Sequence, residues 1–268
     1  MNRIKRWIPA AVLLAMAAAM LAHGPIAQLA HYHEFADTRG MLGIANAGDV
    51  LSNAGFALVG LWGLAALWPH RADPDFARAW PGYALFLAAI VLTAFGSSYY
   101  HLAPDNARLV WDRIPIALAC AGLLAAVDAE TRDTTQPRWL PVGLALAGVA
   151  SVLWWSVTEA RGAGDLRPYL LLQAAPLVLI PLWQANHGTP RAERIAFGVA
   201  IALYAGAKAA ELADHAIFDA LGFMSGHTVK HLLSIAASAV LVANVVAKVR
   251  ARQGGRLAHF ILHSVGIR

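Results

Sequence analysis

Eight long apolar segments constrain this chain more than any other feature of its sequence. A helix that crosses the hydrocarbon core of a bilayer needs roughly 20 mostly apolar residues. The candidate segments are Trp7–Leu29, Val50–Trp68, Gly82–His101, Arg113–Asp128, Trp139–Val157, Pro168–Trp183, Ile195–Asp214 and His227–Val249. They predict an all-α polytopic membrane helix bundle. The last seven would form its core, and the first would be an additional N-terminal hydrophobic helix or a signal segment.

Composition excludes the other broad classes of protein. Hydrophobic residues make up 59% of the chain and charged residues only 14%, whereas soluble domains carry about 25% charged residues. This apolar content also excludes disorder, and a single cysteine, Cys120, excludes a disulfide scaffold. The net charge is +5, but the basic residues stand singly between apolar runs, apart from clusters at the two ends. We therefore expect a lipid bilayer as the partner, and no nucleic acid.

The distribution of basic residues also predicts domain boundaries and orientation. Residues 1–30 read as a hydrophobic helix or a cleaved signal peptide, residues 31–250 as the membrane domain, and residues 251–268 as a basic tail. Lysine and arginine favour the cytoplasmic side. Both tails are basic, whereas the 31–49 loop carries only Arg39. Both termini are therefore expected in the cytoplasm if the first segment is retained.

Ionisable side chains interrupt three of the apolar segments, where burial makes them costly and hence candidates for function. Ser97 and His101 lie four residues apart at the end of the third segment, so they share one helix face. Asp112 opens the fourth segment. His227 and His231 open the eighth, at a spacing that lets two imidazoles bind one metal ion.

Topology brings these groups to the same side of the membrane. The third segment runs outward and ends at His101, while Asp112 and His227 lie where the fourth and eighth segments start from the outer side. Three imidazoles with one coordination position left for water make a plausible catalytic zinc site. The sequence therefore predicts a shared metal site in the outer leaflet.

Each of these residues also has a simpler structural interpretation. Asp112 could cap its helix or pair with Arg113, Ser97 could hydrogen-bond its own helix, and Ser225 could be the N-cap of the last helix. A lone histidine at a membrane interface is usually solvated. The convergence of three distant parts of the chain on one leaflet favours the metal site.

A second polar group lies in the seventh segment. Lys208, Glu211 and Asp214 follow one another at intervals of three residues and so share roughly one helix face. Lys208 is deep enough to need a partner, and Glu211 is the expected one. The pair is interpreted as structural, with the alternative that Glu211 or Asp214 supports the metal site.

The polar residues together resemble the signature of the CREST superfamily of seven-helix membrane hydrolases, most closely that of the alkaline ceramidase family in its bacterial form. The signature is Ser97-x3-His101, then Asp112, then His227-x3-His231. The likeness covers roughly residues 31–250, and its supporting fragments are 49–53, 96–101, 110–115, 208–214 and 225–231.

The resemblance implies roles for individual residues. His101, His227 and His231 match the zinc ligands, Asp112 the acid beside the zinc water, and Ser97 the serine that faces the metal. In eukaryotic relatives a calcium loop precedes the first core helix. Its possible ligands here are Glu34, Asp37 and Asn46, although Arg39 falls where that loop would have an uncharged ligand.

The function implied is that of a zinc-dependent integral-membrane amidase. It would hydrolyse ceramide or a related N-acyl lipid to a free fatty acid and an amine, in the bacterial inner membrane and near the periplasmic face. Asp112 would act as general base and then general acid, and Ser97 would donate a hydrogen bond to the oxyanion.

Three other functions fit parts of the sequence. A receptor-type member of the same superfamily would keep the zinc site and sense a ligand. A bis-histidine haem protein would need histidines that face each other from different helices. A transporter could use Lys208 and Glu211 as an ion relay, but the chain has no broken helices in paired halves.

Overall fold

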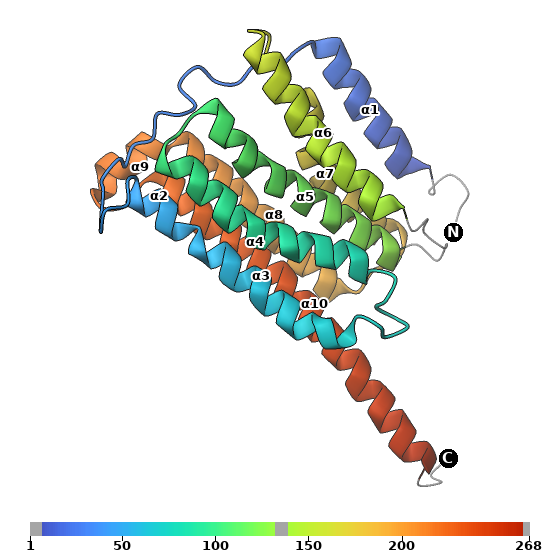
Figure 1. The fold of residues 1–268 in the computed structure, drawn as a ribbon. Coiled ribbons are helices and arrows are strands. Elements are labelled where there is room, and N and C mark those ends of the chain that lie inside the picture. The colour runs from blue at the N-terminus through green and yellow to red at the C-terminus, as the bar shows by residue number, and fades with distance from the viewer. Residues whose placement is uncertain (1–6, 132–138, 265–268) are drawn as a thin grey trace.

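The computed structural model describes residues 7–131 and 139–264 (Figure 1). Within those ranges the chain forms helices and no strands, which confirms the all-α bundle. The helices are α1 (Ile8–His23), α2 (Ala47–Ser52), α3 (Ala54–Leu67), α4 (Trp80–Leu102), α5 (Asn106–Thr131), α6 (Leu140–Ala160), α7 (Arg167–Asn186), α8 (Arg191–Leu212), α9 (Asp214–Leu221) and α10 (Gly226–Ser264), with a 3₁₀ turn, η1, at Trp68–His70.

Seven helical stretches in the described part of the chain are long and apolar enough to cross a membrane. The first combines α2, α3 and η1 over Ala47–His70; α4 to α8 supply five more; the last is Gly226–Gln253 of α10. This is the predicted seven-helix core of a multi-pass membrane protein. In Figure 1, α2 and α9 lie at one end of the bundle and the C-terminus of α10 at the other.

Element boundaries differ most from the sequence prediction at four places. Helix α5 begins at Asn106 and not at Arg113. The first helix ends at His23 and not at Leu29, because Gly24 has a φ of 87° and Pro25 follows it. Its 16 residues span about 24 Å, less than the hydrocarbon core of about 30 Å.

The other two differences lie near the C-terminus. The short helix α9 follows Asp214, where the sequence predicted a loop. Helix α10 continues to Ser264, past the predicted end at Val249, because strong helix formers occupy residues 247–253. The helix therefore takes in most of the predicted tail. Residues 265–268 and the basic residues Arg3, Lys5 and Arg6 lie outside the described ranges.

Close backbone packing of α4 against α5 sets the position of the polar residues on both helices. A Cβ on Gly96 would overlap the carbonyl oxygen of Trp111, and one on Gly122 would overlap the backbone of Phe86. Pro115 lies inside α5 and has no N–H, so the Trp111 carbonyl lacks its usual helical partner. The backbones of α4 and α5 are therefore closest where Gly96 meets the Trp111 carbonyl. Ser97 directly follows Gly96 on α4, and Asp112 directly follows Trp111 on α5.

A second close approach fixes the start of α10. A Cβ on Gly226 would overlap the carbonyl oxygen of Ala210 in α8. Ser225 is the N-cap, as one interpretation of the sequence predicted, since its hydroxyl accepts a hydrogen bond of 2.9 Å from the Thr228 amide. The first turn of α10, which carries His227, is therefore held against α8.

Candidate metal centre

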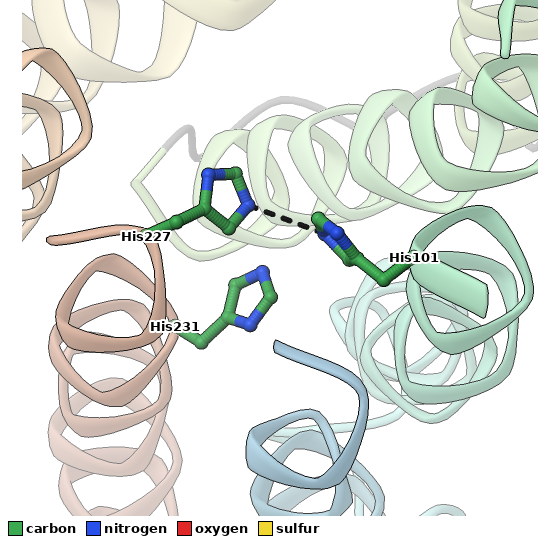
Figure 2. A group of neighbouring side chains, drawn as sticks. All are labelled: His101, His227 and His231. Atoms are coloured by element: carbon green, nitrogen blue, oxygen red, sulfur yellow. Dashed lines mark hydrogen bonds between the residues drawn. The ribbon is translucent and has the colours of Figure 1, made fainter. Parts of the chain in front are cut away.

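Three histidine side chains meet at the end of the bundle formed by α2 and α9. His101 comes from the last turn of α4, and His227 and His231 from the first two turns of α10. All three are buried, with exposed fractions of 1%, 5% and 3%. One ring nitrogen from each lies within 4.8 Å of the others, and Figure 2 shows the rings turned towards one another. The structure therefore assembles the group that the sequence predicted.

The spacing of these nitrogens suits one small ion. Nε2 of His101 lies 3.2 Å from Nε2 of His227. Two nitrogens on one tetrahedral zinc ion, each about 2.0–2.1 Å from the metal, lie about 3.3 Å apart. The same short distance leaves no room for a porphyrin between the two rings, so the geometry does not favour the haem interpretation.

Hydrogen bonds orient one of the rings as a ligand. Nδ1 of His231 lies 2.8 Å from the Ser52 hydroxyl, and Ser52 also donates to the Asp49 carbonyl at 3.0 Å. Such a contact on one ring nitrogen presents the other nitrogen to a metal. Nδ1 of His101 is buried and has no hydrogen-bond partner, and Nε2 of the same ring is the nitrogen that faces His227. A buried group of three imidazoles with one ring fixed in this way is consistent with metal binding.

Two buried carboxylates support the ligand helix. Asp214 accepts hydrogen bonds from the amides of His227 at 2.7 Å and Ala36 at 2.9 Å. Asp49, fully buried in α2, accepts from the hydroxyls of Thr228 at 2.7 Å and Ser225 at 3.2 Å. Asp214 thus supports the histidine site, which was one alternative from the sequence. No role for Asp49 was predicted from the sequence, although this residue lies in a fragment that resembles the family.

The loop before α2 closes the histidine group on its outer side. The Phe35 ring lies 4.7 Å from the His101 ring and 4.5 Å from the His227 ring, between centroids. The Asn46 amide donates to the His101 carbonyl at 2.7 Å. Phe35 was not predicted from the sequence, because an aromatic residue in a loop carries no periodic signal.

Ser97 and Asp112 lie together at this end of the bundle. Both are buried, at 3% and 7% exposed, and both line the same cavity. Asp112 lies in the second turn of α5, which begins at Asn106, and therefore does not cap that helix. The pair supplies a carboxylate and a hydroxyl near the imidazoles.

The predicted Lys208–Glu211 pair is present and has a third member. Glu211 binds Lys208 and Lys230 through different carboxylate oxygens, each at 2.6 Å. Nζ of Lys230 is also 3.4 Å from Nε2 of His227. Lys230 therefore brings a positive charge to the histidine group, and Glu211 offsets it. The sequence could not show this contact, because it depends on the register between α8 and α10.

The three side chains suggested as calcium ligands do not form a free set of oxygen donors. Glu34 is exposed and contacts His31 at 2.6 Å. Both oxygens of Asp37 are bound at 2.7 Å by the Arg39 guanidinium, which holds the pKa of Asp37 below its ordinary value. The Asn46 side chain donates to a backbone carbonyl instead. Because Asp37 and Asn46 are already engaged by other groups of the protein, no calcium site is proposed.

A cavity of about 310 Å³ extends from these polar residues into the apolar bundle. Ser97, Asp112 and His231 lie at its polar end. The remainder is lined by apolar side chains that include Phe86, Ile90, Ile116, Leu123, Leu177, Phe197 and Leu241. The cavity therefore joins a group able to bind metal to a space that suits a hydrocarbon chain.

Comparison of this chain with known protein families, curated proteins and solved structures gave no match in any of the three.

Proposed function

We propose that this protein is a zinc-dependent integral-membrane amidase that hydrolyses ceramide or a related N-acyl lipid to a free fatty acid and an amine. The observation that carries the proposal is the convergence of His101, His227 and His231 beside the Ser97–Asp112 pair. His231, Ser97 and Asp112 also share the cavity that runs into the apolar bundle. The resemblance of the same five residues to the alkaline ceramidase signature supports it independently.

Zinc, when bound by the three imidazoles, would act as a Lewis acid and would lower the pKa of a water molecule to about 7. Asp112 accepts a proton from the attacking water and returns it to the amide nitrogen as the C–N bond breaks. Ser97 donates its hydroxyl hydrogen to the carbonyl oxygen, where negative charge develops. The products are a carboxylic acid and an amine, with one water consumed.

The surroundings of the site suit a lipid amide. The acyl chain would occupy the apolar part of the cavity, and the amide would then lie at the polar end near Ser97 and Asp112. Phe35 covers the imidazoles from the loop side and limits the access of bulk water. We place the protein in the bacterial inner membrane with this end towards the periplasm, because the basic residues cluster in the terminal segments.

The experiment is to incubate the purified full-length protein with a panel of N-acyl lipids and to measure free fatty acid. We expect release that a chelator abolishes and added zinc restores, together with about one zinc per chain. Asp219, exposed on α9, provides a matched control: Asp219→Asn should hydrolyse normally. Metal binding without release from any N-acyl lipid would contradict the amidase and would favour the receptor-type alternative.

A further inference from the structure

A buried arginine at the polar end of the cavity lacks an anionic partner. Arg113 follows Asp112 on α5, is 3% exposed and lines the cavity. Its Nη2 donates to the Gln28 side chain at 2.8 Å, whereas its buried Nη1 has no hydrogen-bond partner. Within the part of the chain that the structure describes, no carboxylate forms an ion pair with it. The pairing with Asp112 that the sequence allowed is therefore absent.

Aromatic rings hold this guanidinium in place. Its central carbon lies 3.9 Å from the Trp155 ring centroid, 5.1 Å from that of Tyr32 and 5.5 Å from that of Tyr169. Cation–π contacts stabilise a desolvated charge, but they do not satisfy an N–H donor. Because arginine stays protonated in proteins, the cage holds a permanent cation with a spare donor.

The cavity as a whole carries an excess of positive charge. Among the described residues that line it, Arg113, Lys208 and Lys230 are cationic, whereas Asp112 and Glu211 are acidic. Glu211 is engaged by both lysines. A divalent ion held by neutral imidazoles would increase the excess. Since a buried charge without a counter-charge is costly, the polar end of this cavity is suited to an anion.

We infer that the amine half of the substrate carries a carboxylate, so that the substrate class is N-acyl amino acids, with Arg113 as the residue that recognises the carboxylate. This inference rests on the proposed amidase function. The acyl chain fills the apolar part of the cavity, and the group on the amide nitrogen therefore lies among the charged residues. A carboxylate pairs with a guanidinium through charge-assisted hydrogen bonds, and its single negative charge offsets the excess of one positive charge among the side chains that line the metal-free cavity.

Cavity size agrees with a lipid that has one chain. Cavities that hold small molecules measure roughly 300–1,000 Å³, and this one, at about 310 Å³, lies at the lower limit. Ceramide has two long chains, whereas an N-acyl amino acid has one. In the reaction, the water oxygen bonds to the acyl carbon, the C–N bond breaks, and the nitrogen takes the proton from Asp112. A fatty acid and a free amino acid leave.

The test compares three substrates, N-palmitoylglycine, N-palmitoylethanolamine and C16-ceramide. The first two differ in one group: the glycine amide ends in a carboxylate and the ethanolamide in a hydroxymethyl group. We expect kcat/KM for palmitoylglycine to be on the order of 30-fold higher than for the ethanolamide, as for a hydrogen bond between charged groups. Arg113→Gln should remove this preference by lowering kcat/KM for palmitoylglycine towards that for the ethanolamide, while the zinc content stays at about one per chain. Arg108→Gln, outside the cavity on the same helix, should keep the preference.

Binding to the metal-free protein separates this inference from the amidase proposal. If no amide is hydrolysed but palmitoylglycine binds more tightly than the ethanolamide, and Arg113→Gln abolishes the difference, the amidase fails and the anion site stands. Equal binding and equal hydrolysis of the two amides would overturn the inference, as would preference for N-palmitoyl-phosphoethanolamine. If Arg113→Gln does not fold, the ratio of kcat/KM for the two amides in the wild-type protein decides. Arg113→Lys, which keeps the positive charge, should then retain part of the preference for palmitoylglycine.

Discussion

Both ends of the bundle bury charged residues, but the charges are paired differently at the two ends. At the end near the C-terminal half of α10, Lys248 bridges Glu130 at 2.6 Å and Glu193 at 3.0 Å, and the Tyr83 hydroxyl donates to Glu130 at 2.9 Å. One oxygen of Glu130, Oε1, has no hydrogen-bond partner, but both carboxylates are paired with Lys248. At the opposite end, Nη1 of Arg113 has no partner, and no carboxylate of the described residues forms an ion pair with this guanidinium. The first group therefore pairs its own charges, whereas Arg113 lacks a counter-charge.

The space around the two groups differs in the same way. The pocket beside Lys248 measures about 30 Å³, against about 310 Å³ at the histidine end. A volume of 30 Å³ admits about one water molecule. Buried charge in a membrane bundle therefore indicates function only when unpartnered donors and open volume occur with it. At the Lys248 end, the carboxylates and the ammonium group cross-link α5, α8 and α10.

The largest effect expected is that of His231→Ala. This variant removes one of three ligands, so we expect bound zinc to be lost and fatty-acid release to fall by on the order of 10³-fold or more. The measurement is metal content by mass spectrometry alongside the release assay. His215, which is exposed on α9, provides the control: His215→Ala should retain both the bound zinc and the release of fatty acid. Full zinc occupancy in the His231 variant would show that the ion binds elsewhere.

Asp112→Asn should separate metal binding from chemistry. The amide is nearly the same size but cannot accept the proton, so the zinc content should remain while kcat falls by about 10² to 10⁴. The comparison with His231→Ala is informative because the two variants lose activity for different reasons. Normal turnover by the Asn variant would exclude Asp112 as the base.

A smaller effect is expected from Ser52→Ala. Loss of the hydroxyl at Nδ1 of His231 frees the ring to rotate, which should weaken zinc affinity by about 10- to 100-fold and leave kcat at saturating zinc nearly unchanged. Zinc titration of the metal-free protein with a competing chelator measures this. Ser151→Ala provides a buried control, since Ser151 bonds only its own helix, at Gly148. Equal affinities in the two variants would leave Ser52 without an orienting role.

The seven core helices and the histidine group were predictable, because span length, helix periodicity and the alternation of spans across the membrane are all present in the sequence. Phe35 and Lys230 were missed, since their contacts depend on how a loop folds back and on the register of α8 against α10. Helix α9 was missed because an eight-residue segment is too short to show as a span.

Two further features have local causes. The calcium ligands were suggested by an acidic spacing, and that spacing did not predict that Arg39, only two residues from Asp37, forms an ion pair with it. The first helix was predicted to continue because residues 24–29 are largely apolar, although Gly24 and Pro25 end it. In both places a single residue within or next to the pattern, Arg39 or Gly24, determines the local structure.

The smallest effect on turnover is expected at the other end of the bundle. Lys248→Met leaves Glu130 and Glu193 buried without their shared cation, which should destabilise the fold by about 3 to 5 kcal/mol. Thermal unfolding in detergent should show a clear fall in Tm, while kcat/KM stays within about twofold, because this group lies away from the large cavity. Adding Glu130→Gln and Glu193→Gln should restore part of the stability by removing the unpaired charges. If Lys248→Met instead impaired zinc binding or amide hydrolysis as strongly as Asp112→Asn does, the two ends would be coupled, and the division between a structural and a functional charged group would be wrong.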